Sequence, residues 1–295
     1  MARDPSSAIL FELLRSFTML AHTLNLSKAV RELGSTRQTV RRHIDLLEEN
    51  KGESLFVVED RQYLLTEAGR RALPEAEKLL SRGDAWLKDQ SSHISGLFSL
   101  AIEQKTSDDI LYYLQQHPLG ALWRENSSLL QFGFKCWANA KGQIESPEFA
   151  AIRPYIIVFR QFEGSWICTE IGDESSYTSW HGWKSQRSNI GRRIGELPGG
   201  TGVADLLMHP FRDVLAHETL RLDHIFTLNK RHDTDGKIPI SYQRLMMGCR
   251  LPDDSFAIAT LIDLTDNIQI NGLSHERAMS MNKDYIMNVD VSSLH

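Results

Sequence analysis

The sequence predicts an α+β protein in two parts: a small helical head with a β-hairpin, continued by one long helix, and a larger C-terminal part that combines an antiparallel sheet with helices. Residues 1–65 hold short apolar helix patterns and one hairpin pattern. A near-heptad apolar pattern follows in residues 66–92. After residue 150, runs of β-favouring residues are separated by turn sequences.

The composition fits an ordinary globular protein with room for two domains. The chain has 295 residues, of which 41% are apolar and 24% charged. We expect a cytoplasmic protein with no membrane association, because there is neither a basic and apolar leader nor an apolar run of about 18 residues. Cys136, Cys168 and Cys249 are too few and too scattered for a disulfide framework or a Cys-rich metal site. Each is either a buried inert thiol or an oxidant sensor.

The first helix of the head is predicted over residues 10–24, from the apolar spacing of Leu13, Leu14, Phe17 and Leu20. A second helix follows in residues 26–34. We expect Ser27 to cap its N-terminus and Gly34 to end it, with Ala29 and Val30 facing inward.

The third helix carries the most informative pattern in the chain. Thr36 is a good cap, and Val40, Ile44 and Leu47 recur at helical spacing, so they face inward. The opposite face then presents arginine and glutamine, which suit the base edges of guanine and adenine in the major groove. The pair of helices therefore predicts a helix-turn-helix that binds double-stranded DNA. The predicted contacts on this helix are Thr36, Arg37, Gln38, Thr39, Arg41 and Arg42. The alternative is that these arginines form only a solvated face.

Two short strands are predicted in Leu55 to Leu65, around the polar turn Glu59 to Gln62. A hairpin placed after a helix-turn-helix forms a wing, whose tip contacts phosphate or the minor groove. Arg61 is the predicted contact there.

The long helix predicted over residues 66–92 has an apolar stripe that another helix must cover. We therefore predict a homodimer, possibly part of a higher oligomer, that places two recognition helices on two half-sites. The alternative is that this helix packs on its own C-terminal domain. Pro74 interrupts the pattern and could bend the helix. The stripe consists of Ala68, Ala72, Ala76, Leu79, Leu80, Gly83 and Leu87.

From about Leu10 to Leu80 the chain resembles the LysR-type transcriptional regulators. The matching features are the helix-turn-helix, Leu55-Phe56 after the recognition helix, and Leu65 to Gly69 (LTEAG) after the wing. The resemblance implies a winged helix-turn-helix followed by a linker helix that pairs two subunits. Arg42 occupies the family's common arginine position. Thr36-Arg37-Gln38 replaces the family's usual Ser-Gln-Pro, so the resemblance does not supply the operator sequence.

The C-terminal part lacks the strand-helix alternation of the usual LysR effector domain. We expect a hinge at residues 90–96, a helical connector over residues 93–149 (helices at 97–123 and 129–140), a sensor domain over residues 150–272 and a polar tail over residues 273–295. The expected domain has a hairpin turning at Glu163-Gly164, helices and loops in residues 174–225, and strands at 238–251 and 256–263. That order resembles a PAS-type sensor fold, as do the stretches 191–197, taken as the start of the helices, and 242–247. Such a fold offers a ligand pocket or a dimerisation face.

No catalytic or metal site is predicted. The histidines show no HExxH or comparable spacing, although a haem would need only one of His209, His217 and His224, which we expect in a helical region. Residues 199–202 read as a plain glycine loop rather than a phosphate cradle. Trp166, Trp180 and Trp183 suit a core or an interface, and could stack on a planar ligand. The cofactor, if any, and a possible small-molecule ligand of the C-terminal domain stay open.

The net charge of −5 is compatible with DNA binding because of how it is distributed. The first 90 residues contain 14 basic and 14 acidic residues, so the acidity lies beyond them. The sequence thus predicts a sequence-specific, dimeric transcriptional regulator that is not an enzyme, with a PAS-like sensing or dimerisation domain. The alternative is an enzyme or partner-binding protein with a helix-turn-helix head.

Overall fold

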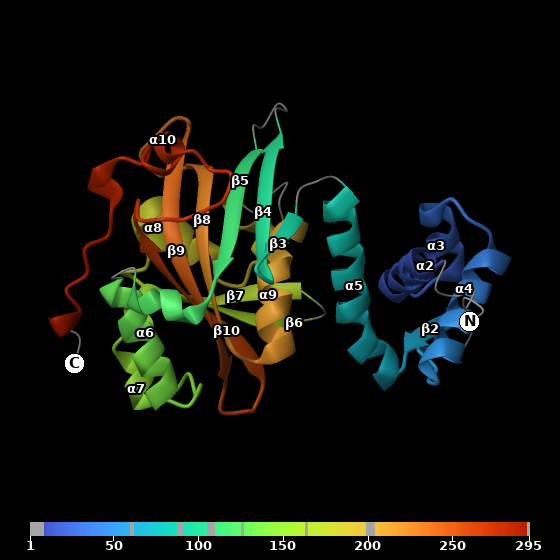
Figure 1. Ribbon diagram of the computed structural model, residues 1–295. Coiled ribbons are helices and arrows are strands. Elements are labelled where there is room, and N and C mark those ends of the chain that lie inside the picture. The colour runs from blue at the N-terminus through green and yellow to red at the C-terminus, as the bar shows by residue number, and fades with distance from the viewer. Residues whose placement is uncertain are drawn as a thin grey trace. The chain divides into compact units, whose positions relative to one another are not determined.

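The computed structural model of the protein divides into two compact units, Met1–Lys88 and Asp89–His295 (Figure 1). It describes residues 9–59, 62–87, 91–104, 110–124, 127–162, 165–198 and 204–293. None of the helices in these ranges is long and apolar enough to cross a bilayer.

The first unit begins with three helices, α2 (Leu10–Thr23), α3 (Leu26–Leu33) and α4 (Arg37–Lys51). Each helix buries one side in a shared core, as the apolar spacing predicted. Phe17 of α2, Ala29 of α3 and Val40 of α4 are completely buried at its centre. The core fixes the position of α4, whose other side is left exposed.

The predicted wing and long helix are both present. Strands β1 (Phe56–Glu59) and β2 (Gln62–Leu65) pair antiparallel, and α5 runs over Glu67–Leu87. Pro74 lies within α5 without ending it. An ideal Cβ at Gly69 would lie 2.2 Å from the carbonyl oxygen of Leu55, so only glycine lets α5 start this close to the wing.

The second unit is built on one eight-stranded sheet in which every neighbouring pair is antiparallel. Its order is β3-β4-β5-β8-β9-β10-β6-β7. The last strand of the meander, β10, therefore pairs with the first strand of the earlier hairpin, β6. The strands are β3 (Ser91–Ile94), β4 (Leu97–Gln104), β5 (Ile110–His117), β6 (Ile156–Phe162), β7 (Ser165–Ile171), β8 (Leu220–Lys230), β9 (Lys237–Arg250) and β10 (Phe256–Leu264).

Helices cover both faces of this sheet (Figure 1). Strand β10 shows the alternation: Ala259 and Leu261 enter the core beneath α6 (Ser128–Asn139), and Ile258 enters the core beneath α9 (Ala204–His217). The remaining elements are α7 (Pro147–Ala150), α8 (Ser176–Asn189), α10 (His275–Ala278) and the 3₁₀ helices η1 (Leu119–Trp123), η2 (Arg153–Tyr155), η3 (Ile194–Glu196), η4 (Lys283–Tyr285) and η5 (Val291–Ser293).

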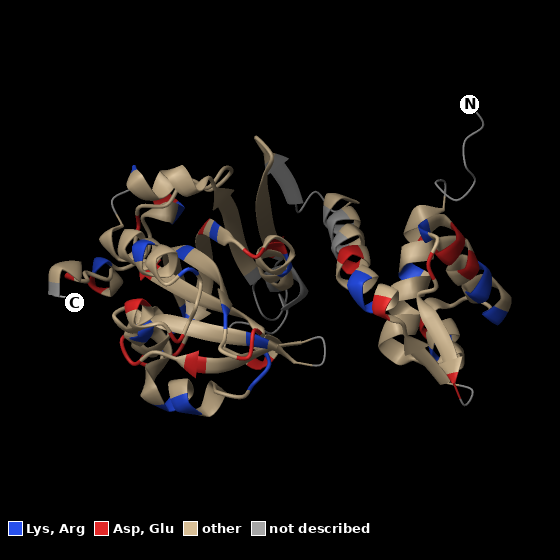
Figure 2. Ribbon diagram, turned by 90° about the horizontal axis from the view of Figure 1, so that it is seen from below, with Lys and Arg blue, Asp and Glu red and all other residues tan. Residues whose placement is uncertain are grey.

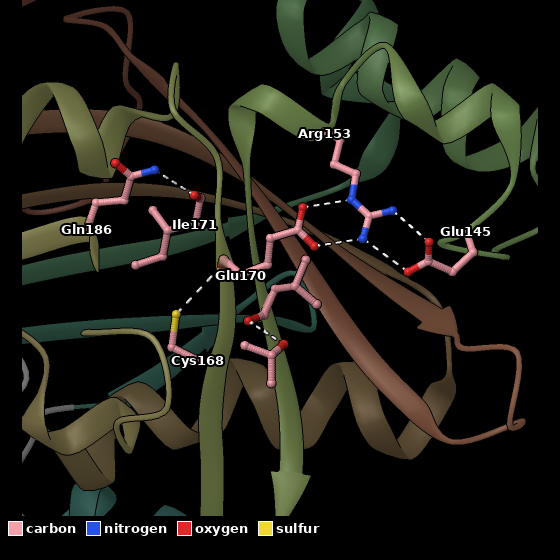
Figure 3. Close-up of polar contacts among 8 residues, drawn as sticks. Glu145, Arg153, Cys168, Glu170, Ile171 and Gln186 are labelled. Atoms are coloured by element: carbon pink, nitrogen blue, oxygen red, sulfur yellow. Dashed lines mark hydrogen bonds and ion pairs between the residues drawn. The ribbon is translucent and has the colours of Figure 1, made fainter. Parts of the chain in front are cut away.

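One arginine fastens the hairpin β6–β7 to the segment before α7 (Figure 3). The Arg153 guanidinium donates two hydrogen bonds to Glu170 on β7, at 2.7 and 2.9 Å, and two to Glu145, at 2.9 and 3.0 Å. These hydrogen bonds lower the pKa of the Glu145 carboxyl. Because each carboxylate accepts two hydrogen bonds from Arg153, the segment just before β6 is fixed to β7 and to the residues before α7.

The helix predicted at 97–123 is wrong, because residues 97–104 and 110–117 form the strands β4 and β5. Their side chains alternate between the two faces, so Leu100 and Ile102, two positions apart on β4, lie on the same face and are buried in one cluster with Leu114. The expected hinge is also wrong where it is described, because residues 91–94 form β3. The helix predicted at 129–140 is confirmed as α6.

The later half of the predicted order is largely confirmed. The hairpin strands, β9 and β10 lie where expected, while the turn at Glu163-Gly164 is outside the described residues. The helices after the hairpin start earlier than residue 191, at Ser176 of α8, because Ser175 caps that helix. The helices and loops expected in residues 174–225 end earlier than predicted, since β8 starts at Leu220. The strand was missed because charged residues such as Arg221 and Asp223 are rarely buried, yet both are buried here.

The polar tail predicted for residues 273–295 is also wrong over its described part. Ala278 and Met281 are buried, and Met287, Val289 and Val291 pack against the core. These apolar residues have irregular spacing, so no helix or strand pattern marked them. Met281 and Met287, for example, are covered because they pack against apolar residues of the sheet.

Candidate nucleic-acid interface

The turn between α3 and α4 is set by caps at both of its ends. Asn25, not the predicted Ser27, caps α3, and its side chain accepts a hydrogen bond from the backbone N–H of Lys28 at 3.0 Å. At the other end of α3, Gly34 has φ 59°, the left-handed conformation expected of a C-terminal glycine.

Helix α4 is capped by Thr36, as predicted. The Thr36 hydroxyl accepts a hydrogen bond from the backbone N–H of Thr39 at 3.1 Å, and it lies 2.8 Å from the Thr39 hydroxyl. Thr39 is half-buried and takes part in the cap. The cap holds the N-terminal end of α4 and its partial positive charge at the protein surface.

The outward face of α4 contains the other predicted contacts. Gln38, Arg41 and Arg42 are exposed, and within the part of the chain that the structure describes none of them has a hydrogen-bond or ion-pair partner. Arg37 is also exposed, but its guanidinium donates a 2.7 Å hydrogen bond to the Ser27 hydroxyl on α3. Free guanidinium groups in the first turns of an exposed helix are available to base edges and phosphates.

The inward face of α4 is fixed in two ways. Val40, Ile44 and Leu47 are buried, as predicted. In addition, the His43 ring nitrogen Nδ1 lies 2.7 Å from the hydroxyl of Ser16, a buried residue of α2. The rotation of α4 about its own axis is therefore set, and with it the direction of the arginines.

The wing is attached to the same helix. Glu48 of α4 accepts hydrogen bonds from the backbone N–H groups of Leu55 at 2.6 Å and Phe56 at 3.0 Å. This carboxylate fixes where β1 leaves the helical core. The tip of the wing, with the predicted contact Arg61, lies outside the described residues; Glu59 and Gln62, the last described pair, face each other in the hairpin.

The surface of the head is mixed in charge rather than uniformly basic (Figure 2). Basic and acidic residues both occur along its helices, and Asp45 and Glu49 of α4 are exposed beyond the arginines. A positive region confined to the start of α4 suits contacts with specific bases better than attraction over a wide surface.

No metal site is found among the residues of the second unit that the structure describes. Cys136, Cys168 and Cys249 are buried and unbonded to each other. Burial raises the pKa of Cys168 and of Cys249 to about 12, which keeps both thiols protonated. His209 and His217 lie on α9, whereas His224, expected in a helix, lies buried on β8.

Three residues of the interface escaped the sequence reasoning. Ser27 holds Arg37, His43 holds α4 on α2, and Glu48 holds the wing. Ser27 was expected to cap α3 instead, and His43 and Glu48 were not singled out. Glu48 was the one residue of the three with a signal in the sequence, because this acidic residue directly follows the inward-facing Leu47.

Comparison with known proteins agrees with the geometry of the head. Residues 11–70 match the model of the bacterial regulatory helix-turn-helix protein, lysR family. The N-terminal unit is thus a lysR-family helix-turn-helix, as the sequence resemblance implied. The matched residues include α2, α3, α4 and the wing.

Curated relatives match over stretches of 69 to 100 residues. The uncharacterized HTH-type transcriptional regulator YbhD of Escherichia coli (strain K12) is 32% identical over 91 residues, which are 30% of this chain and 29% of that protein. The HTH-type transcriptional regulator BbuR of Bordetella bronchiseptica is 35% identical over 100 residues, covering 32% and 30%. The HTH-type transcriptional activator AllS of Klebsiella pneumoniae is 41% identical over 69 residues, covering 23% and 26%. The chain spans less than a third of the length of each.

Two solved structures give similar coverage. The complex of the BenM DNA-binding domain with catB site 1 DNA is 28% identical over 27% of this chain and 89% of that one, with a TM-score of 0.26. Corynebacterium glutamicum OxyR in its oxidized form is 24% identical over 27% of this chain and 26% of that one, also with a TM-score of 0.26.

Proposed function

We propose that the protein is a dimeric, sequence-specific transcriptional regulator that binds double-stranded DNA and responds to a signal through its C-terminal unit. The observation that carries the proposal is the outward face of α4. Its capped start presents Gln38, Arg41 and Arg42 in the exposed state, while its inward face is locked on α2. A helix-turn-helix reads the major groove with this part of its second helix.

The proposed dimer rests on the exposed apolar face of α5. Leu79, Trp86 and Leu87 are 49%, 70% and 69% exposed, and their spacing around Gly83 places them on one side of the helix. Phe11 of α2 continues this face, since its ring lies 2.6 Å from where a Cβ at Gly83 would be. A second copy of α5 would cover these side chains.

The proposed sensing role rests on the topology of the second unit. A hairpin, β6–β7, is followed by α8 and α9 and then by the meander β8-β9-β10, which returns so that β10 pairs with β6. This supports the PAS-like assignment of residues 150–272. The strands β3, β4 and β5 extend the sheet beyond β8, so the predicted boundary at residue 150 cuts through the sheet.

The proposal is tested by selecting bound sequences from a library of random duplex DNA at two salt concentrations. We expect the full chain to enrich a two-fold symmetric motif, and a variant with Arg37, Arg41 and Arg42 changed to alanine to lose it. Each lost base contact costs about 1 to 3 kcal/mol, and lost phosphate contacts reduce the salt dependence.

The matched control removes the same charge elsewhere. Arg124, Arg187 and Arg192 are exposed residues of the second unit, and their triple alanine variant should enrich the same motif as the unchanged chain. Equal weak binding by all three proteins, without a motif, would show that the head does not read DNA.

Dimerisation is tested separately by sedimentation. Changing Trp86 and Leu87 to serine should convert the dimer to a monomer and leave half-site binding only. A monomeric unchanged chain, or a variant that still sediments as a dimer, would contradict the role given to α5.

A further inference from the structure

A cavity of about 430 Å³ lies in the second unit, between the face of the sheet that α9 covers and the helix α8. This volume is in the range of small-molecule sites. Its walls are mostly apolar and aromatic, including Phe159, Tyr177 and Phe211. Polar side chains of β5, β9 and β10 form part of the wall on the sheet side.

Four polar groups in this wall are buried without a partner among the described residues. They are the Tyr112 hydroxyl, the Trp180 Nε1–H, the Arg244 Nε–H and the Thr260 hydroxyl. Each belongs to a residue that is no more than 6% exposed. Leaving one such group unsatisfied costs about 1 to 3 kcal/mol, so four around one cavity need an explanation.

All four groups can donate a hydrogen bond, and two of them can do nothing else. The nitrogens of Trp180 and Arg244 have no acceptor capacity, and the hydroxyls of Tyr112 and Thr260 can turn their protons toward the cavity. Burial raises the pKa of Tyr112, so its proton stays in place. An occupant that satisfies the wall must therefore bring acceptors.

The orientation of Arg244 is fixed from behind. One terminal nitrogen of Arg244 donates to Asp223 at 2.8 Å, and Asp223 also accepts from Arg221 at 2.8 Å. Arg221 is in turn bound to Asp213 of α9 at 2.7 Å. The network uses the far end of the Arg244 guanidinium and leaves its Nε–H unpaired.

The charged residues that line the cavity are basic, and one of them, Arg244, is paired with Asp223 behind the wall. Lys230, Lys237 and Arg244 line it, and none of the described lining residues is Asp or Glu. His181 adds no charge near neutral pH, because burial and the neighbouring His232 lower its pKa to about 4. The cavity therefore favours an anion over a neutral or cationic molecule.

We propose that this cavity binds a small organic carboxylate whose apolar body packs against the aromatic wall and whose oxygens accept hydrogen bonds from Arg244, Tyr112 and Thr260. A carboxylate offers two acceptor oxygens, with about four lone-pair positions, together with a negative charge, so it can accept from several donors of one wall. The inference deepens the proposed function, since this ligand would be the signal that the second unit senses.

The test is isothermal titration calorimetry of the full chain, without DNA, with matched acids and amides. The probes are phenylacetate against phenylacetamide, and hexanoate against hexanamide. We expect at least one acid to bind and its amide to bind at least tenfold more weakly, as expected when a charged hydrogen-bond acceptor is replaced by a neutral one.

Two variants test whether the hydroxyl groups of the wall bind the acid. Thr260→Val and Tyr112→Phe remove an unpartnered hydroxyl and keep the shape of the side chain. Each should weaken binding of the acid roughly tenfold, while the thermal stability of the unliganded protein stays equal or rises, because a buried unsatisfied group is removed. A hydroxyl with a structural role would instead give a less stable protein.

The matched control is Tyr113→Phe. Tyr113 neighbours Tyr112 on β5, does not line the cavity and bonds instead to Glu103. This variant should bind the acid like the unchanged chain. Failure of both acids to bind, equal binding of acid and amide, or full binding by Thr260→Val would each overturn the proposal. Because no DNA is present, any of these outcomes leaves the result of the DNA selection standing.

Discussion

The two units use arginine in opposite ways. In the first unit Arg41 and Arg42 extend from α4 into solvent and have no partner among the described residues. In the second unit Arg221 and Arg244 are 2% and 6% exposed, and both bind the buried carboxylate of Asp223. The residue type is the same, but one pair faces a solution that contains potential partners and the other pair is enclosed with its own.

Whether a charged residue is exposed or buried follows from the face of the helix or strand on which it lies. On α4, the helical period places the arginines opposite the apolar residues Val40, Ile44 and Leu47, so they must be exposed. On β8, Arg221 and Asp223 share the face of the sheet that α9 covers, so they must be buried. The exposed arginines of α4 are proposed to contact DNA, whereas the buried arginines of β8 and β9 form ion pairs inside the second unit.

The largest effect is expected from Asp223→Asn. This change leaves two buried guanidinium groups without their shared anion, which costs about 3 to 5 kcal/mol of unfolding free energy. Urea unfolding followed by tryptophan fluorescence measures it in the right unit, because five of the six tryptophans lie beyond residue 88. The control Asp233→Asn breaks a more exposed pair with Arg231 and should cost no more than about 1 kcal/mol. Equal losses in the two variants would remove the distinction between buried and exposed arginine.

A second effect has the opposite sign and depends on pH. Burial raises the pKa of Asp263 to about 6. A 2.6 Å hydrogen bond from the Ser127 hydroxyl lowers the pKa and offsets only part of this rise. The folded protein then binds more protons than the unfolded chain between pH 3.8 and about 6, so ionised Asp263 lowers stability above that window and the cost disappears below it.

Asp263→Asn should therefore stabilise the protein at pH 8 by up to about 3 kcal/mol and change little at pH 4. Urea unfolding at both values measures the difference. If the variant is destabilised equally at pH 4 and pH 8, the ionised Asp263 carboxylate does not lower the stability of the folded protein.

A smaller effect is expected at the cap of α4. Thr36→Ala removes the hydroxyl that accepts from the Thr39 N–H, at a cost of about 1 kcal/mol, and Thr36→Ser should restore it. Thermal unfolding followed by circular dichroism of the full chain detects the helical unit. If alanine and serine behave alike, the cap does not hold the start of the recognition helix.

The smallest effect on stability is expected from two of the arginines proposed to contact DNA. Changing Arg41 and Arg42 to alanine should alter the unfolding free energy by no more than about 0.5 kcal/mol, because neither side chain has a partner to lose in the described structure. Thermal unfolding of the double variant checks this. A clear loss of stability would mean that these arginines hold the head together, as Arg221 and Arg244 hold the second unit.

The head was predictable because its pattern is local. Apolar residues at helical spacing, the cap Thr36, the terminal glycine Gly34 and the hairpin at residues 55–65 each act within a few neighbours. The cap of α3 was misplaced by two residues, since Asn25 and not Ser27 is the N-cap, and this left the fold unchanged.

The second unit was predicted less well, and two of its strand pairings, β5 with β8 and β10 with β6, join segments that are far apart in the chain. Strand β5 pairs with β8, more than a hundred residues away, so Tyr112 lies opposite Thr227. Each also pairs with the strand next to it in the chain, β5 with β4 and β8 with β9, but residues 97–123 were predicted as a helix. The segment 97–117, rich in leucine and glutamine, then resembled a helix.

The sequence by itself determined the helix-turn-helix, the wing, the long helix and the outward direction of the arginines on α4, since each of these follows from the periodicity of one short segment. Only the tertiary structure decided that β3, β4 and β5 extend the sheet, that Asp223 binds two arginines, and that Tyr112, Trp180, Arg244 and Thr260 surround one cavity. The physical reason is distance along the chain: these residues span about 150 positions, and what each side chain meets is fixed by the pairing of strands that no local pattern encodes.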